Sequence, residues 1–291
     1  MKMKGIILAA GRGTRLYPAT KAISKPMLPV YDRPMVYYPM ATLMSLGIRE
    51  IMIISSAADI GGYNRLFGDG SHLGLEMSYA VQNRLRGIAD AFIIARGFIG
   101  NDDVCLALGD NIFLGREFYH MLEEFRMPEQ GALVFGYPVE DPRAFGVVEF
   151  DEEFNVLSLE EKPEHPKSNY IVPGLYFYDN QVSDIAAELK PSDRGELEIT
   201  DVNKAYLERQ QLKVNLISKE IEWFDAGSAQ GLLVAANAAE RAEREKGELN
   251  CIEEIAYRKG FVTKDQLEKL IKPLKKTKYG KHLQAVLNGG V

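Results

Sequence analysis

The sequence has only two cysteines and four histidines among its 291 residues, and it has no long apolar run. Cys105 and Cys251 lie far apart and form no disulfide framework, which fits the reducing cytoplasm. The histidines share no metal-ligand spacing, which argues against a zinc site. No apolar run approaches the ~18 residues of a membrane span, and we expect no membrane partner. The first residues lead into a predicted strand rather than a secretory signal.

An excess of positive charge is also lacking. The net charge is −6, which argues against nucleic acid as a partner. Hydrophobic residues make up 46% of the chain and charged residues 26%, which is ordinary for a globular protein. A length of 291 residues allows one large α/β domain or two small ones.

What the sequence does contain is a short apolar run followed by a glycine-spaced turn with cationic residues. Residues 6–9 read as a buried strand, because a parallel strand covered on both faces needs no polar alternation. Gly11 and Gly13 allow a tight turn whose backbone N–H groups can approach an anion. Arg15 and Lys25 add positive charges that can pair with phosphate oxygens. The pattern predicts a loop that binds polyphosphate.

The spacing excludes two other phosphate-binding loops. The dinucleotide fingerprint has glycine or alanine at its sixth position, where this chain has Leu16. A Walker loop closes with Gly-Lys-Ser/Thr, which this segment lacks. A Gly-x-Gly turn alone is a weak signal, so on the turn alone a plain tight connection stays an alternative.

Strand-like and helix-like segments alternate through residues 1–228. This alternation predicts an α/β core with a mostly parallel, Rossmann-like sheet flanked by helices. The expected strands lie at residues 6–9, 50–55, 77–81, 104–108, 132–137, 146–150, 156–160, 172–178, 214–217 and 221–225. The expected helices lie at residues 34–46, 88–98 and 197–210. From residue 229 to 291 the strand signals vanish, which predicts a helical C-terminal extension that docks on the main body or on another subunit.

Two aspartates stand at the ends of predicted strands. Asp110 follows the strand at 104–108, and Asp225 ends the strand at 221–225. Open α/β sheets bind ligands at the carboxyl ends of their strands, where two carboxylates can share a hard cation such as Mg²⁺. Either aspartate alone is more often the cap of a following turn. Beside a phosphate loop, the pair favours a metal site.

Two further groups of residues carry weaker signals. Lys162 and Arg194 are candidates for a second, smaller phosphate, and Glu161 could accept hydrogen bonds from sugar hydroxyls. A surface ion pair is the simpler reading of these three residues. Gln82 follows a predicted strand, five residues before Gly87, and its amide could read a pyrimidine edge.

The longer pattern around these residues resembles the sugar-phosphate nucleotidylyltransferases. Residues 8–16 and 24–29 carry the signature of that family. Motifs over nearly the whole chain are similar to those of its glucose-1-phosphate thymidylyltransferase group. They lie at residues 17–20, 28–35, 108–111, 145–150, 160–163, 166–170, 174–179, 194–201 and 253–258. The resemblance implies that dTTP and glucose 1-phosphate are converted to dTDP-glucose and pyrophosphate, the first step toward dTDP-rhamnose and related deoxysugars.

The resemblance also implies a role for each matching residue. The triphosphate would be held by Gly11, Gly13, Thr14, Arg15 and Lys25. The thymine would be bounded by Leu8, Gln82 and Gly87. Mg²⁺ would be held by Asp110 and Asp225. The glucose would be lined by Asn111, Gly146, Glu161 and Val172, and its phosphate held by Lys162 and Arg194. The catalytic residues would be Arg15, Lys25, Asp110, Lys162 and Asp225.

A general base is not expected in such a reaction. The second pKa of a sugar phosphate is about 6, so the nucleophile is already largely a dianion at neutral pH. The lack of a Ser/His/Asp or Cys/His triad in the sequence agrees with this. The resemblance further implies a homotetramer in which the helical extension builds contacts between subunits and a second, regulatory nucleotide-sugar pocket.

The chain departs from the family pattern beside the implied base pocket. Residues 83–86 read Asn-Arg-Leu-Arg, where a segment with proline and aspartate is usual. A relative that uses UTP or another sugar phosphate is therefore an alternative. A non-catalytic, nucleotide-sugar-binding regulatory subunit is a second one, but such a binder needs no metal pair.

Overall fold

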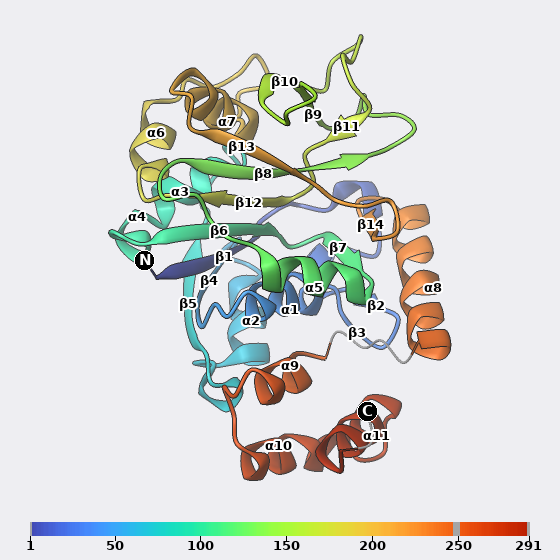
Figure 1. Ribbon diagram of the computed structural model, residues 1–291. Coiled ribbons are helices and arrows are strands. Elements are labelled where there is room, and N and C mark those ends of the chain that lie inside the picture. Colours follow the sequence, from blue (N-terminus) through green and yellow to red (C-terminus); the bar gives the residue numbers. More distant parts are fainter. Residues whose placement is uncertain (1, 247–250, 290–291) are drawn as a thin grey trace.

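The computed structural model describes residues 2–246 and 251–289. A mixed β-sheet forms its centre, with helices on both faces (Figure 1). The strands are β1 (Met3–Ala9), β2 (Pro29–Val30), β3 (Arg33–Pro34), β4 (Glu50–Ser55), β5 (Glu76–Val81), β6 (Asp103–Leu108), β7 (Asn111–Leu114), β8 (Ala132–Pro138), β9 (Gly146–Phe150), β10 (Val156–Glu161), β11 (Tyr170–Ile171), β12 (Leu175–Tyr178), β13 (Leu212–Leu216) and β14 (Glu222–Asp225). The helices are α1 (Tyr37–Ser45), α2 (Ile60–Phe67), α3 (Asp90–Ile94), α4 (Arg96–Ile99), α5 (Arg116–Glu124), α6 (Val182–Glu188), α7 (Ile199–Glu208), α8 (Ala229–Lys246), α9 (Ile252–Arg258), α10 (Lys264–Ile271) and α11 (Lys278–Leu287). Short 3₁₀ turns are η1 (Thr14–Leu16), η2 (Lys25–Met27), η3 (Ser71–Leu73) and η4 (Lys272–Leu274).

The sheet has the strand order β10-β9-β11-β8-β12-β6-β1-β4-β5, and β13 also pairs with β8. β1 pairs in parallel with β4 and β6, and β4 pairs in parallel with β5. β12 lies between β6 and β8 and runs antiparallel to both, and an antiparallel group of β9, β10 and β11 extends the sheet. The predicted α/β fold, with its parallel sheet region and flanking helices, is confirmed.

The apolar run of β1 explains how the sheet is covered. Neighbouring side chains of a strand point to opposite faces, so Ile6 and Ile7 enter different cores. Ile7 packs in the core that includes α1, α2 and α5, whereas Ile6 packs in the core that includes α3, α6 and α7. Both side chains are fully buried. The lack of alternation in the sequence therefore follows from helices on both faces.

Several elements differ from the expectations, and α2, α5, α6, β2, β3 and β11 were not expected at all. The helix expected at 88–98 is two short helices, α3 and α4, that meet at Ala95. The strand expected from residue 172 begins only at Leu175. Pro173 has no backbone N–H to donate, and the backbone N–H of Gly174 donates to the side chain of Asn111 instead of to a neighbouring strand. The sequence did not predict β7, which pairs with β14 in a separate two-stranded sheet beside the main one.

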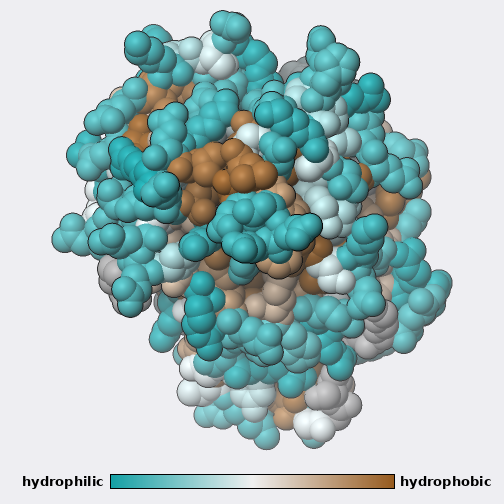
Figure 2. Space-filling view, turned by 45° about the horizontal axis from the view of Figure 1, so that its top comes forward, coloured by the Kyte–Doolittle hydropathy of each residue, from teal (hydrophilic) through white to brown (hydrophobic). Residues whose placement is uncertain are grey.

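The face shown in Figure 2 is largely hydrophilic, with apolar patches between the polar side chains. On α8, Leu233 is 55% exposed and Val234 is 42% exposed. The other face of α8 packs Ala235, Ala238 and Ala239 in a small core with β2 and β7. Among residues 2–246 and 251–289 we find no helix with the length and apolar character that a membrane crossing requires.

The C-terminal helices dock on the body through α9. Ile252 is buried in the same core as α1, while α10 and α11 pack around Leu267 and Leu283 in a core of their own. Figure 1 shows α9 next to the body, with α10 and α11 beyond it. Of the two docking modes expected for this extension, the structure shows contact with the main body of the same chain. Among the residues described from 229 onward, the exposed large apolar side chains are Leu233 and Val234 of α8.

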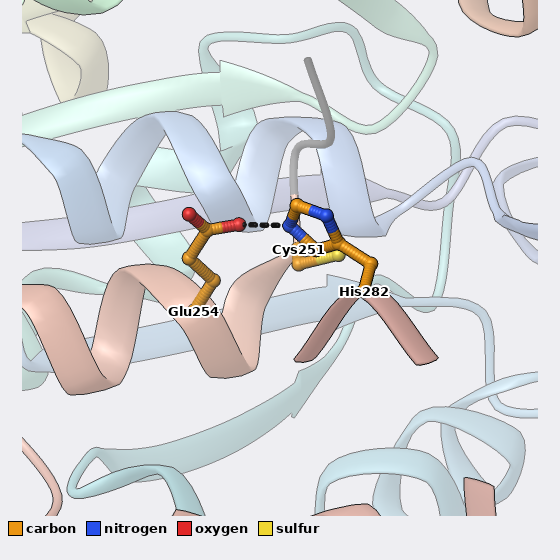
Figure 3. Close-up of side chains that lie close together, drawn as sticks. All are labelled: Cys251, Glu254 and His282. Atoms are coloured by element: carbon orange, nitrogen blue, oxygen red, sulfur yellow. Dashed lines mark hydrogen bonds and ion pairs between the residues drawn. The ribbon is translucent and has the colours of Figure 1, made fainter. Parts of the chain in front are cut away.

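A hydrogen-bonded cluster holds α11 against α9 (Figure 3). The His282 Nε2 atom lies 2.6 Å from Oε2 of Glu254, and the Arg258 Nε atom donates to Oε1 of the same carboxylate at 2.7 Å. Burial opposes the charge of Glu254, but the hydrogen bonds from His282 and Arg258 outweigh it and lower the pKa of this carboxylate. Glu254 is thus stabilised as an anion between the two helices.

We expect Glu254→Gln to lower the Tm at neutral pH, because hydrogen bonds to a charged group contribute about 1.5–3 kcal/mol. Since the folded pKa of Glu254 lies below its ordinary value, its contribution is present above about pH 4.3 and is lost as the pH falls through the folded pKa. The Tm difference between wild type and variant should therefore narrow in acid.

Thermal unfolding between neutral pH and about pH 3 measures this difference. Glu268→Gln, at an exposed glutamate of α10, is the matched control and should change the Tm little. A difference for Glu254→Gln that stays constant down to the lowest pH would contradict the interpretation.

Candidate active site

The predicted phosphate loop connects β1 to the 3₁₀ turn η1. Gly13 has φ 60°, and its carbonyl accepts a hydrogen bond from Thr20 Oγ1 at 2.7 Å. A Cβ on Gly13 would lie 3.2 Å from Cβ of Lys25, so the backbone of the loop packs closely on that residue. A Cβ on Gly11 would meet nothing within 4 Å. The fold itself thus requires glycine at position 13, whereas the space beside Gly11 is open to a ligand.

The structure brings the two predicted carboxylates together. In the ladder of β7 and β14, Asn111 is opposite Asp225, so Asp110 lies next to Asp225. The Nζ atom of Lys25 contacts the Oδ2 atom of Asp110. Burial and the charge of Asp110 raise the pKa of Asp225, although Lys25 and Arg15 act in the opposite direction. Two carboxylates thus lie close together in a partly buried place, and this donor set of oxygens fits a divalent cation.

Asn111 fixes the position of this pair. Its Oδ1 atom accepts hydrogen bonds from the Gly174 backbone N–H at 2.9 Å and from Trp223 Nε1 at 2.8 Å. Its Nδ2 atom donates to Oδ1 of Asp110 at 3.1 Å. A Cβ on Gly174 would lie 2.7 Å from the Asn111 side chain, so this close approach requires glycine. The amide ties the first carboxylate to the strand that carries the second.

A cavity of about 330 Å³ opens beside the carboxylates, a size typical of small-molecule sites. Of the predicted site residues, it is lined by Arg15, Asp110, Asn111, Gly146, Glu161, Lys162, Val172 and Asp225. Sequence reasoning missed several other lining residues, among them Tyr176, Thr200, Asn203 and Trp223. The sequence offered one signal for three of them: Tyr176 lies in the motif at 174–179, Thr200 lies in the motif at 194–201, and Asn203 follows that motif.

The far end of the cavity is built around Glu161. Thr200 Oγ1 donates to Glu161 Oε2 at 2.6 Å, and Arg194 Nη2 donates to Oε1 at 3.3 Å. Lys162 Nζ lies 3.4 Å from the same Oε1. Arg194 also bonds to Glu198 at 2.8 Å and does not itself line the cavity. Lys162 and Arg194 thus share the Glu161 carboxylate, and the phosphate of a ligand could take the place of this carboxylate as their partner.

The implied base-binding residues lie next to the cavity rather than in its lining. Gln82 directly follows β5 and is buried, and its Nε2 atom donates to the carbonyl of Gly87 at 3.3 Å. Gly87 has φ 100°, and a Cβ there would lie 2.3 Å from the carbonyl oxygen of Leu197. Leu8 belongs to β1, and its carbonyl accepts from Gly109 N–H at 2.9 Å. Ile88, which follows Gly87, connects this region to the cavity lining.

A second group with metal-binding side chains lies in the C-terminal helices. Ligand atoms of Cys251, Glu254 and His282 are within 4.8 Å of one another (Figure 3). In this group, the imidazole of His282 is hydrogen-bonded directly to the carboxylate of Glu254. Burial raises the pKa of the Cys251 thiol, and the Arg33 guanidinium lies 3.9 Å from its sulfur. These contacts form a cluster that joins α9 to α11.

The arrangement has the features of an enzyme that handles two phosphorylated ligands. Arg15 and Lys162 both line the cavity; Lys25 contacts the lining residue Asp110, and Arg194 contacts the lining residue Glu161. The carboxylate pair lines the same cavity of an α/β fold. These are the features of a nucleotidyltransferase.

Comparison with known proteins agrees with this class. The sequence model of the nucleotidyl transferase family matches residues 4–242. Glucose-1-phosphate thymidylyltransferase of Neisseria gonorrhoeae is 51% identical over 97% of this chain and 98% of its own length. The enzyme of the same name from Mycobacterium tuberculosis H37Rv is 50% identical over 98% of this chain and 99% of its own length.

Solved structures are similar as well. A Bacillus anthracis protein, assigned as a glucose-1-phosphate thymidylyltransferase and solved with sucrose, has a TM-score of 0.75 at 43% identity and covers 81% of this chain and 95% of its own. A UDP-glucose pyrophosphorylase solved with UDP-glucose has a TM-score of 0.73 at 26% identity, covering 83% of this chain and 99% of its own. The chain belongs to the nucleotidyl transferase family and, within it, to the glucose-1-phosphate thymidylyltransferases.

The two carboxylates should affect stability in opposite directions when neutralised. Asp225→Asn removes a buried charge that is repelled by Asp110, so the Tm of the ligand-free protein should rise. Asp110→Asn leaves the buried ammonium of Lys25 without its anion, so the Tm should fall by the equivalent of about 1–3 kcal/mol. Differential scanning calorimetry without substrate or metal measures both variants. Equal destabilisation by the two substitutions would show that mutual repulsion does not govern this pair.

Proposed function

We propose that this chain transfers a thymidylyl group from dTTP to glucose 1-phosphate, giving dTDP-glucose and pyrophosphate. The observation that carries the proposal is a cavity lined by a carboxylate pair and by Arg15 and Lys162, with Lys25 and Arg194 paired to carboxylates of its lining. The two relatives with about 50% identity over nearly the whole chain bear the name of that activity. The product would enter the synthesis of dTDP-rhamnose and related deoxysugars.

The nucleotide is assigned to the end of the cavity beside β1. Backbone N–H groups of the loop around Gly11, Gly13 and Thr14 would hold the triphosphate, with the charges of Arg15 and Lys25. The open space at Gly11 supports this assignment, because no neighbouring atom of the described residues lies within 4 Å of a Cβ built there. Leu8, Gln82 and Gly87 would bound the thymine.

Mg²⁺ is assigned to Asp110 and Asp225. The chemistry of the donor set supports it, since two carboxylates and phosphate oxygens are the ligands that Mg²⁺ prefers. When bound, the cation would neutralise charge on the reacting phosphates and on the leaving pyrophosphate. Asn111 would keep Asp110 in place through its hydrogen bonds to Asp110, Gly174 and Trp223.

Glucose 1-phosphate is assigned to the opposite end. Asn111, Gly146, Glu161 and Val172 would line the sugar, with the Glu161 carboxylate accepting from its hydroxyls. Lys162 and Arg194 would hold its phosphate in place of their present contacts with Glu161. Release of the two cations would leave Glu161 free to bond to the sugar.

The reaction then needs positioning and charge neutralisation rather than a base. The phosphate dianion of the sugar would attack the α-phosphorus of dTTP, and pyrophosphate would leave from the opposite side. Lys162 and Arg194 fix the nucleophile, while Arg15 and Lys25 stabilise charge on the leaving group. Each of these steps uses a charged side chain in a fixed place, and none requires a proton to be removed.

Two alternatives remain distinguishable by experiment. The structural similarity to UDP-glucose pyrophosphorylase favours UTP as a second candidate for the nucleotide. Thymine and uracil differ by one methyl group, so we expect a preference of at most about a hundredfold for dTTP. A regulatory subunit without activity would show no turnover with any nucleotide triphosphate.

We also propose that the chain forms a homotetramer in the cytoplasm, with residues 229–291 as the oligomerisation and regulatory extension. The exposed Leu233 and Val234 on α8 support a contact with another subunit. Two free, buried cysteines and the proposed metabolite substrates support the cytoplasm. A second nucleotide-sugar pocket near Glu254 and Arg258 would regulate the enzyme.

Substitutions at the two phosphate-binding ends should change different kinetic constants. We expect Arg15→Ala to lower kcat about 10²-fold or more, because it removes charge stabilisation of the leaving group. Lys162→Ala should mainly raise the KM for glucose 1-phosphate, because it removes a contact with the incoming substrate. Steady-state release of pyrophosphate from dTTP and glucose 1-phosphate measures both, and it tests the proposed activity itself.

Lys167→Ala is the matched control for Lys162, since Lys167 pairs with Glu160 and does not line the cavity. The assignment of the two ends is wrong if Lys162→Ala changes only the KM for the nucleotide. The proposed function is wrong if the wild-type protein releases no pyrophosphate from this pair of substrates.

A further inference from the structure

The amide of Gln82 is held in one orientation by two acceptors. Its Nε2 atom donates to the Gly87 carbonyl at 3.3 Å and to the Asp90 Oδ2 atom at 3.0 Å. Within the described residues, both hydrogen bonds made by the Gln82 side chain use this nitrogen. Neither a carbonyl nor a carboxylate can donate, so a flipped amide would lose both bonds and face two acceptors with its oxygen.

Burial makes this orientation strict. Asp90 is only 2% exposed, and Gln82 is 5% exposed, so water has little access to replace a lost bond. The Arg86 Nη2 atom donates to Asp90 Oδ1 at 2.6 Å and supplies the opposite charge that a buried carboxylate needs. The carboxylate therefore uses one oxygen for Arg86 and the other for Gln82.

The loop that carries these residues is fixed by the backbone of Leu197. Its N–H donates to the Arg86 carbonyl at 2.6 Å, and its carbonyl accepts from the Ala89 N–H at 3.2 Å. Glycine is required at position 87, because a Cβ there would lie 2.3 Å from the Leu197 carbonyl oxygen. The acceptors that orient Gln82 are thus held by the main chain of the neighbouring segment.

We infer that Asp90, supported by Arg86, is a positioning residue that makes Gln82 an obligate hydrogen-bond acceptor toward the base. This inference rests on the proposed function, in which Gln82 contacts the base of the nucleotide. An acceptor at this place selects a base with a ring N–H, as thymine and uracil have at N3. Cytosine has a bare acceptor at N3 and is rejected, because two acceptors would face each other.

The unusual segment at residues 83–86 then contributes to the choice of base through Arg86. Of its two arginines, Arg86 supports the acceptor state of Gln82 through its hydrogen bond to Asp90. Arg84 is exposed, and no hydrogen bond joins it to Asp90 or Gln82 among the described residues. The departure from the family pattern therefore maintains selection for a base with an N3–H. It provides no discrimination between thymine and uracil.

The test compares kcat/KM for dTTP, UTP and dCTP, with glucose 1-phosphate as the second substrate. The wild-type enzyme should prefer dTTP to dCTP by at least about 10²-fold. Asp90→Asn removes the charge and offers an amide that can donate, so Gln82 can flip. The dTTP to dCTP ratio should then fall about tenfold or more, while the dTTP to UTP ratio and the KM for glucose 1-phosphate stay within about twofold.

Arg86→Gln is a second variant, in case Asp90→Asn does not fold, and it should lower the same ratio by about threefold or more. Arg84→Gln is the matched control and should leave all ratios unchanged. An unchanged dTTP to dCTP ratio in folded, active Asp90→Asn or Arg86→Gln enzyme would overturn the inference. If the wild-type enzyme uses neither dTTP nor UTP, the proposed function fails instead.

Discussion

The pairing of β7 with β14 is the constraint on which the rest of the site depends. It sets Asn111 opposite Asp225 and so places Asp110 beside a second carboxylate from a distant part of the chain. Burial raises the pKa of Asp225, and so does the charge of Asp110, which shows that the folded protein disfavours the ionised form of this side chain. Lys25 and Arg15 act against this shift, and a divalent cation bound by the two carboxylates would do the same. The fold thus holds a charge arrangement that binding would complete.

Charge also explains the division of the cavity into two ends. Arg15 and the loop at Gly11–Gly13 lie on the side of β1, whereas Lys162 and Arg194 gather around Glu161 on the side of β10. Both ends use positive charge, as a reaction between two phosphorylated substrates requires. With a nucleophile that is already ionised, the enzyme needs to hold and neutralise its substrates and does not need to remove a proton.

Local patterns predicted the fold well and the site in part. The apolar run of β1, the glycine turn and the strand-terminal aspartates are local features, so residues 6–15, Asp110 and Asp225 could be singled out from the sequence. The short strand β7 could not, because its pairing with β14 depends on contacts between distant segments. Tyr176 and Asn203 reach the cavity only through the packing of β12 and α7. The same holds for the contact of His282 with Glu254, and for Asp90, whose partners become visible only when the loop is folded.

The dependence of turnover on Mg²⁺ in the two neutralised variants tests the central claim most directly. Pyrophosphate release from dTTP and glucose 1-phosphate would be measured across a Mg²⁺ titration for the wild type, Asp110→Asn and Asp225→Asn. If the carboxylate pair holds the cation, both variants should lose at least about 10²-fold in kcat at saturating Mg²⁺. Near-normal turnover in both variants would contradict the account.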